Sequence, residues 1–179
     1  LGWAMLEERT SGRGERSSNV GAQDMSLGVK FALTEQCGWR PETAGILQMT
    51  VPTGDSAFTA ERVLIGGVWV YSTEINDYWS VGGQTQLSQA IDELDHVYTE
   101  FGQSAVSGIS LTEQLSCFVE WFALIPHSAL ASSADPVHYL DGGFTYLLNN
   151  NIQYDIWSGI GLNDEAADYF LGTGLSVRF

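Results

Sequence analysis

The sequence has few basic residues, and this shortage limits its partners. Lys and Arg together number 7 against 22 Asp and Glu, which gives a formal net charge of -15. A protein that binds nucleic acid needs basic side chains to neutralise a row of phosphates. Nucleic acid is therefore excluded as a partner.

Long hydrophobic runs and paired cysteines are also missing. No window holds the roughly 18 to 20 consecutive apolar residues that a membrane-spanning helix needs, which excludes a helical membrane protein. Cys37 and Cys117 are the only cysteines, stand in unlike contexts and form no metal-binding spacing, so we expect two free thiols and no metal. The chain begins at Leu1 without a signal peptide, so we expect a mature product or a fragment.

Alternation of apolar residues with small or polar ones is the dominant pattern that is present. In residues 169–179 the odd positions form an apolar face with an aromatic residue at each end, Tyr169 and Phe179, while the even positions are mostly small and end at Arg178. Such a period of two predicts a β-strand. The apolar face fits the core of a soluble sheet or the lipid-facing side of a membrane barrel.

The same alternation recurs along the chain, and no segment of useful length has a helical period. Strands are expected at residues 26–34, 39–51, 63–75, 79–88, 98–112, 115–125, 138–149, 152–162 and 169–179, with a doubtful first one at 1–6. Short turns at 35–38, 76–78, 113–114 and 149–151 alternate with longer hydrophilic connections at 7–24, 52–62, 89–97, 126–137 and 163–168. Short turns at one end and longer loops at the other are typical of an outer-membrane barrel.

Two all-β architectures fit this pattern. A soluble antiparallel sandwich would turn its apolar faces inward. Apart from residues 98–112, the clear strands have 9 to 13 residues and are instead suited to the roughly 9 to 11 residues that a tilted strand needs to cross a bilayer. We therefore expect an antiparallel up-and-down transmembrane β-barrel of about ten strands, forming one domain over residues 1–179 in a bacterial outer membrane. Lipid and lipopolysaccharide are its expected surroundings, and the acidic loops are expected to be solvated.

The two faces of the strands give two groups of candidate residues. Aromatic residues expected in the interfacial girdles are Trp39, Trp79, Tyr154, Tyr169 and Phe179. Residues expected to line the lumen are Lys30, Arg40, Glu42, Phe118, Glu120, Phe122, Tyr139, Asp141, Asp155, Trp157 and Arg178. We also expect Leu175 and Val177 to be exposed, and Arg178 to lie inside beside an acid.

A family resemblance adds to this interpretation. It rests on the runs SLGVK (26–30), ALTE (32–35), GWRP (38–41), VPTG (51–54), SLTE (110–113), HYLDGGFTYLL (138–148), GLND (161–164) and GLSVRF (174–179). In their order and spacing these resemble bacterial outer-membrane proteins assigned to the MetA pathway of phenol degradation. The resemblance implies a channel for small hydrophobic or aromatic compounds, with no cofactor.

The resemblance also bears on the two ends of the chain. Family members look longer at the N-terminus, so Leu1 is expected near an early strand of a truncated chain whose complete form has up to twelve strands. The ending resembles the signal read by the barrel-assembly machinery, with Gly174, Val177 and Phe179 at the expected offsets; Gly172 departs from that pattern.

The sequence leaves alternatives to passive transport open. The inward rings of Phe118 and Phe122 equally fit a narrow barrel whose lumen is plugged. A structural or adhesive barrel is a second function class, and a barrel enzyme acting on lipids is a third. His96, His127 and His138 stand near acids in or beside loops, but they form no recognisable catalytic set, so we expect no enzyme.

Overall fold

The computed structural model describes residues 5–12, 15–130 and 135–178, with side chains from residue 18 onward. All named elements in these residues are β-strands: β1 (Met5–Gly12), β2 (Glu15–Ala22), β3 (Met25–Thr34), β4 (Glu42–Val51), β5 (Leu64–Asn76), β6 (Trp79–Ile91), β7 (Val97–Ser110), β8 (Leu115–His127), β9 (Val137–Asn149), β10 (Ile152–Gly161) and β11 (Tyr169–Val177). No helix that is long and apolar enough to cross a membrane occurs in the described part of the chain.

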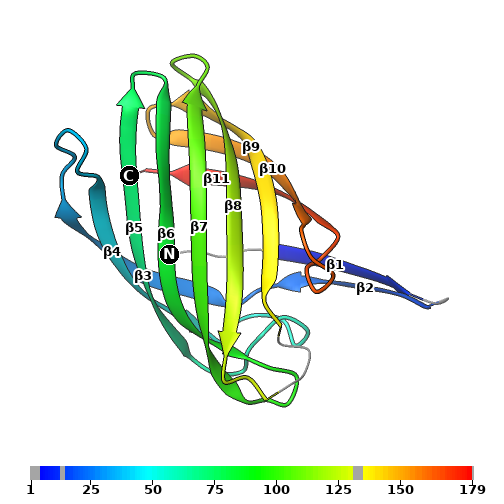
Figure 1. Cartoon of the computed structure of the whole chain (residues 1–179). Coiled ribbons are helices and arrows are strands. Elements are labelled where there is room, and N and C mark those ends of the chain that lie inside the picture. The colour runs from blue at the N-terminus through cyan, green and yellow to red at the C-terminus, as the bar shows by residue number, and fades with distance from the viewer. Residues whose placement is uncertain (1–4, 13–14, 131–134, 179) are drawn as a thin grey trace.

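Strands β3 to β11 form one curled antiparallel sheet. Each strand pairs with the strands before and after it in the chain, which is the up-and-down order. Figure 1 shows the sheet curling into a half-barrel, with short turns at the upper end and longer connections at the lower end. The hairpin β1–β2 forms a separate two-stranded sheet that extends away from this half-barrel.

The two edge strands of the sheet, β3 and β11, run in the same direction. Neither pairs with another strand on its outer side among the described residues. Since strand direction alternates across the sheet, a direct pairing of β3 with β11 would be parallel. Unpaired edge groups are costly in lipid, so these edges are the part of the sheet that most needs a partner strand.

Contacts between strands that are not neighbours identify the concave face. The ring of Phe122 on β8 lies 6.1 Å from that of Phe170 on β11, although β9 and β10 separate these strands in the sheet. Side chains can meet in this way only on the concave face of a curled sheet. The strand register then places every second residue of each strand on that face.

The opposite, convex face is apolar and exposed. Leu175 is 63% exposed and Val177 is 47% exposed, as predicted for the last strand. Leu47 and Ile65 on neighbouring strands are exposed to a similar degree. No large side chain in the described residues is fully buried. A soluble sandwich would bury such residues between two sheets, so the distribution of apolar side chains contradicts that alternative.

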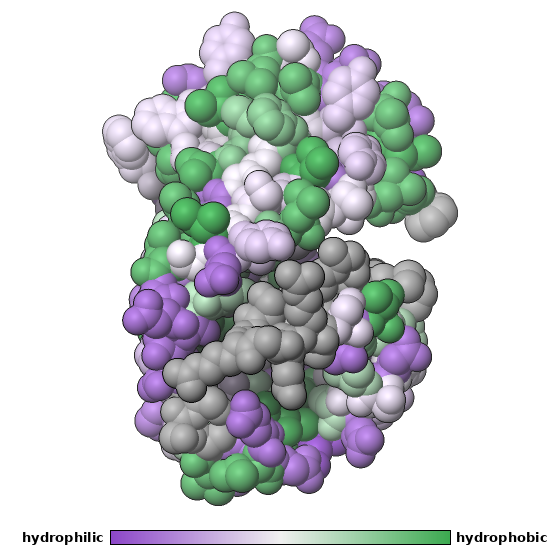
Figure 2. Space-filling view, turned by 90° about the vertical axis from the view of Figure 1, so that its right-hand side faces the viewer, coloured by the Kyte–Doolittle hydropathy of each residue, from purple (hydrophilic) through white to green (hydrophobic). Residues whose placement is uncertain are grey.

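Hydrophilic residues gather toward one end of the molecule. In the view of Figure 2 they are concentrated in the lower half, the end at which Figure 1 places the longer connections. The acidic excess of the chain thus lies largely beyond the apolar part of the convex face. The expected separation of apolar strands from polar loops is present in the structure.

The structure differs from the sequence prediction mainly at residues 7–24. This stretch was expected to be a loop, but most of it forms the hairpin of β1 and β2, whose eight residue pairs run from Met5↔Ala22 to Gly12↔Glu15. Both faces of the hairpin are polar in sequence, so it carries no alternation to reveal its strands. The connection expected at 89–97 is also shorter, because β6 and β7 remain paired up to Ile91↔Val97.

Asp24, between β2 and β3, holds the connection 52–63 in place by hydrogen bonds. Its carboxylate accepts hydrogen bonds from the backbone N–H groups of Thr53 (3.0 Å), Gly54 (2.9 Å) and Ala60 (2.8 Å). Partial burial disfavours its ionised form, but these bonds and one from Thr59 outweigh that effect and lower the pKa of Asp24 below its ordinary value of 3.8. The ionised form of Asp24 therefore stabilises this connection.

We expect Asp24→Asn to loosen the connection 52–63, because an amide presents one acceptor oxygen where the carboxylate presents two. A carboxyl whose pKa is lowered by folding stabilises the fold above its unfolded pKa, and that contribution is lost as the pH falls through the folded pKa. Hydrogen exchange at the Gly54 and Ala60 amides should be faster in the variant at pH 7. The difference from the unchanged protein should disappear as the pH falls through the lowered pKa of Asp24. Equal exchange at pH 7 would refute this role.

Candidate functional site on the concave face

Four aromatic side chains form one cluster on the concave face, contributed by β8, β9, β10 and β11. We call Phe122, Tyr139, Trp157 and Phe170 the aromatic cluster. The rings of Phe122 and Tyr139 stack at 4.8 Å, and Phe170 contacts Tyr139 at 5.5 Å and Trp157 at 5.6 Å, both edge to face. These separations are typical of favourable aromatic pairs. The cluster lies toward the long-loop end, where the Tyr139 hydroxyl accepts a hydrogen bond from the Ala167 N–H at 3.1 Å.

Glycines give the rings room to lie against the wall. A Cβ atom at Gly172 would lie 2.1 Å from the Trp157 ring, and one at Gly159 would lie 2.2 Å from the Phe170 ring. Both glycines are register partners of the aromatic residues that cover them, since Trp157 pairs with Gly172 and Gly159 pairs with Phe170. The glycines therefore leave room for the rings of Trp157 and Phe170 to lie over the neighbouring backbone.

A pair of acidic side chains lies beside this cluster. Glu120 on β8 and Asp141 on β9 are direct register partners on the concave face. The Asp141 Oδ1 atom is buried and has no hydrogen-bond partner among the described residues. A Cβ atom at Gly159 would contact Asp141 as well as Phe170, so the acid adjoins the aromatic cluster. Two negative charges in this position repel each other, and the repulsion costs free energy of folding. Packing alone does not explain why both acids are present.

Two hollows meet next to this acidic pair. One has a volume of about 280 Å³ and the other about 330 Å³, and both are lined by Gln84, Ser104 and Glu120. Phe122 lines the smaller hollow, which links it to the aromatic cluster. Neutral polar groups, a carboxylate and an aromatic ring thus border one continuous stretch of the concave face.

Most residues predicted to face inward lie on the concave face by register. Phe118, Glu120, Phe122, Tyr139, Asp141, Asp155 and Trp157 are all partly buried there. Glu42 and Lys30 have concave register positions but are exposed, Lys30 because β3 is an edge strand. Phe170 was not among the predicted residues, although it holds the aromatic cluster together.

Two arginines predicted to line the lumen lie outside the strands. Arg40 is exposed in the turn that precedes β4, where it forms a backbone bridge with Cys37 around Gly38, whose φ is 58°. The turn places it outside the strands, because regular pairing resumes only at Glu42. Arg178 follows the end of β11 and is exposed; among the described side chains no carboxylate lies within ion-pair distance of it. Arg178 does not occupy the expected position beside an acid.

The predicted girdle residues that the structure describes lie at or near strand ends or in a turn, with exposed side chains. Trp39 is 90% exposed in the turn before β4, and the indole of Trp79 donates to the Ser107 hydroxyl at 2.8 Å. Tyr154 lies near the turn between β9 and β10, whereas Tyr169 is at the opposite end of its strand. Phe179 lies outside the described residues. Tyr146, the register partner of Tyr154, extends the aromatic group at the short-turn end.

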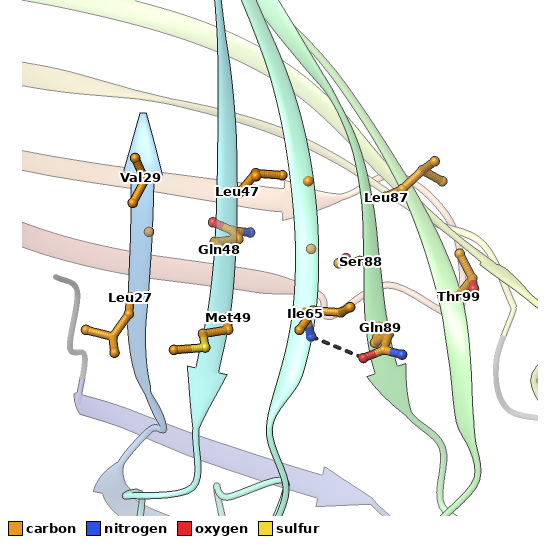
Figure 3. Close-up of a pocket in the computed structure, with 13 residues that line it drawn as sticks. Leu27, Val29, Leu47, Gln48, Met49, Ile65, Leu87, Ser88, Gln89 and Thr99 are labelled. Carbon is orange, nitrogen blue, oxygen red and sulfur yellow. Dashed lines mark hydrogen bonds between the residues drawn. The ribbon is translucent and has the colours of Figure 1, made fainter. Parts of the chain in front are cut away.

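The convex face carries a separate apolar groove. It has a volume of about 690 Å³ and crosses β3 to β7 near their long-loop ends (Figure 3). Its apolar lining comes from Leu27, Val29, Leu47, Met49, Ile65 and Leu87. Gln89 closes one side by accepting a hydrogen bond from the Ile65 N–H at 3.2 Å. The groove is part of the exposed apolar wall and does not belong to the concave site.

The three histidines have different surroundings in the structure. His138 stacks on Trp121 on the convex face, with ring centroids 5.9 Å apart. His96 lies 3.9 Å from Asp92 in the connection between β6 and β7. His127 is exposed at the end of β8. The contacts of His138 and His96 join neither of them to another histidine.

Comparisons with known proteins agree with this geometry. The sequence matches a family model described as "Putative MetA-pathway of phenol degradation" over residues 1–179. No curated protein matches the sequence. The fold is similar to a solved structure titled "NanC porin structure in rhombohedral crystal form", with a TM-score of 0.61 at 7% identity, over 99% of this chain and 93% of that chain.

At this low identity the porin likeness concerns the fold alone. It confirms the prediction of an all-β barrel with antiparallel strands, whose concave face is the lumen. The family match confirms the resemblance seen in the sequence. The chain has a porin-type β-barrel fold and belongs to the family described as "Putative MetA-pathway of phenol degradation".

Proposed function

We propose that this protein is a passive channel for small hydrophobic or aromatic compounds in a bacterial outer membrane. The observation that carries the proposal is the aromatic cluster in the lumen, which presents ring faces and edges beside two polar hollows. Aromatic solutes can stack on such rings at several neighbouring places, so that no single contact holds them tightly. The family description supports the same class of solute.

The proposed surroundings follow from the convex face. Its exposed leucines, isoleucines and valines suit lipid, and the aromatic residues at the short-turn end suit an interface. The acidic long connections would then face the lipopolysaccharide side. The C-terminal strand would serve as the recognition segment for the barrel-assembly machinery. Transport needs no reaction at the site, so the proposal includes neither catalysis nor a cofactor.

Solute flux into liposomes that contain the folded protein tests this function. We expect phenol to enter faster than into empty liposomes. Phe170→Ala should reduce its entry several-fold, because Phe170 contacts three other rings of the aromatic cluster. Phe144→Ala is the matched control, since Phe144 is 52% exposed on the convex face and should leave flux unchanged.

Two results would oppose the proposal. Phenol entry at the rate of empty liposomes would indicate a plugged lumen and favour a structural barrel. Equal losses of flux from Phe170→Ala and Phe144→Ala would show that the aromatic cluster has no specific role.

A further inference from the structure

We propose that the lumen selects by charge, admitting cations and uncharged solutes while rejecting anions. This inference rests on the proposed channel function and concerns which solutes that channel admits. It is carried by the register of the sheet, which brings acidic residues from distant parts of the chain to one level of the wall.

Three carboxylates lie on one row of register partners that crosses the sheet. The row runs Glu42, Ser72, Gly82, Val106, Glu120, Asp141, Gly159 and Phe170, each residue being the register partner of the next. We call it the acidic row. Ser72, Gly82, Val106 and Glu120 also line the larger hollow. Glu120 therefore borders the open space of this hollow, and its neighbour Asp141 is partly buried beside it.

Further acids lie on the same face at other levels. Register places Glu74, Glu100 and Asp155 on the concave face of β5, β7 and β10. With the three acids of the acidic row, this gives six carboxylates on the concave face of β4 to β10. Among the described residues none of the six forms an ion pair.

Basic residues are not placed to balance these acids. Lys30 is the one basic residue of β3 to β11, and its register partner is the apolar Ile46. Arg40 and Arg178 lie beyond the strand ends, and Arg62 pairs with Asp95 in the long connections. The other three arginines precede residue 18. The lumen wall therefore carries a negative charge that the described side chains do not neutralise.

This charge has a direct effect on solutes. A low-dielectric wall concentrates the field of its charges, which raises the local concentration of cations and lowers that of anions. Rings of Asp and Glu produce cation preference in other channels by the same physics. An uncharged phenol would pass the acidic row without electrostatic repulsion, whereas an aromatic carboxylate of similar size would be repelled and excluded.

The reversal potential of the folded full chain in a planar bilayer, under a potassium chloride gradient, tests the inference. We expect its sign to show cation preference in the unchanged protein. The double variant Glu120→Gln, Asp141→Asn should lower the potassium-to-chloride permeability ratio by up to about tenfold. The control Asp164→Asn, Glu165→Gln removes the same charge from the connection 162–168 and should keep the ratio.

The outcomes separate this inference from the channel itself. Conductance with anion preference in the unchanged protein would overturn charge selection while leaving a channel in place. A ratio that the lumen variant leaves unaltered would also overturn it. A complete lack of conductance would overturn the proposed channel and this inference together. Heat-dependent gel mobility shows whether each variant has folded, and the unchanged protein tests the sign without any substitution.

Discussion

Val119→Arg is expected to destabilise the folded barrel by about 2 to 4 kcal/mol in a bilayer, which is the usual cost of an arginine on the lipid face near the midplane. Val119 is 50% exposed on the convex face in the middle part of β8. An arginine there would have to reach either membrane surface or remain in hydrocarbon. Denaturant unfolding of the protein in lipid vesicles measures this cost.

The matched control places the same residue on the other face. Gln84→Arg introduces the charge beside Glu120, because both residues line the two hollows of the lumen. Water and the acids of the lumen can accommodate it, so we expect a change below about 1 kcal/mol. If the two variants lost equal stability, or if Gln84→Arg lost more, the assignment of the faces would be wrong.

Gly143→Ala is expected to destabilise the barrel by about 1 to 3 kcal/mol, the usual cost of forcing an extra methyl group into a packed region. A Cβ atom at Gly143 would lie 2.3 Å from the Ile156 carbonyl oxygen and 2.8 Å from the Trp157 Cα atom. These are backbone atoms of the neighbouring strand, so β9 and β10 would have to separate. The same unfolding experiment measures the effect, and Trp fluorescence should report displacement of Trp157.

Gly67→Ala is the control for this prediction. Its new Cβ atom would meet nothing closer than 3.9 Å, so a methyl group fits there. Replacing a strand glycine where space allows reduces the entropy of the unfolded chain and stabilises by about 0.4 to 1 kcal/mol. Equal effects of the two substitutions would show that close strand approach at Gly143 does not matter.

The sequence is sufficient to predict the faces of the strands. Alternation placed Leu175 and Val177 on one apolar face, the length of the strands and the asymmetry of their turns assigned that face to the exposed side, and both residues are exposed in the structure. Period-two alternation is strong wherever one face is apolar and the other polar. It fails in β1 and β2, because both faces of that hairpin are polar and alternation has nothing to distinguish.

Turns limit the prediction of single residues. Arg40 and Arg178 continue the alternation of neighbouring strands in sequence, so they were assigned to the lumen. Arg40 precedes the start of β4, and Arg178 follows the end of β11, although its backbone N–H still donates to the Asn151 carbonyl at 2.8 Å. Strand boundaries depend on hydrogen bonding between strands, which a one-dimensional pattern does not contain.

Alternation along a strand does not predict which residues of the site are neighbours across strands. On its face of β11, Phe170 is followed by Gly172 and Gly174, so the strand shows no apolar pattern on that face. Only the contacts of Phe170 with Tyr139 and Trp157 reveal its role. The pairing of Glu120 with Asp141 likewise depends on the register of β8 and β9. A shift of one residue would turn either side chain to the opposite face. The register must therefore be known before separate inward-facing residues can be recognised as one site.

The most direct test is a cysteine scan along residues 115–125 of β8, with Cys37→Ser and Cys117→Ser as background and the folded barrel in lipid vesicles. A charged, membrane-impermeant thiol reagent should label cysteines at Phe118, Glu120 and Phe122, which face the lumen, and leave those at Val119 and Trp121 unreacted in the bilayer. Reaction with a period of two would establish a water-filled lumen behind a lipid-facing wall. Labelling of Val119 and Trp121 as fast as their neighbours, or faster, would contradict it.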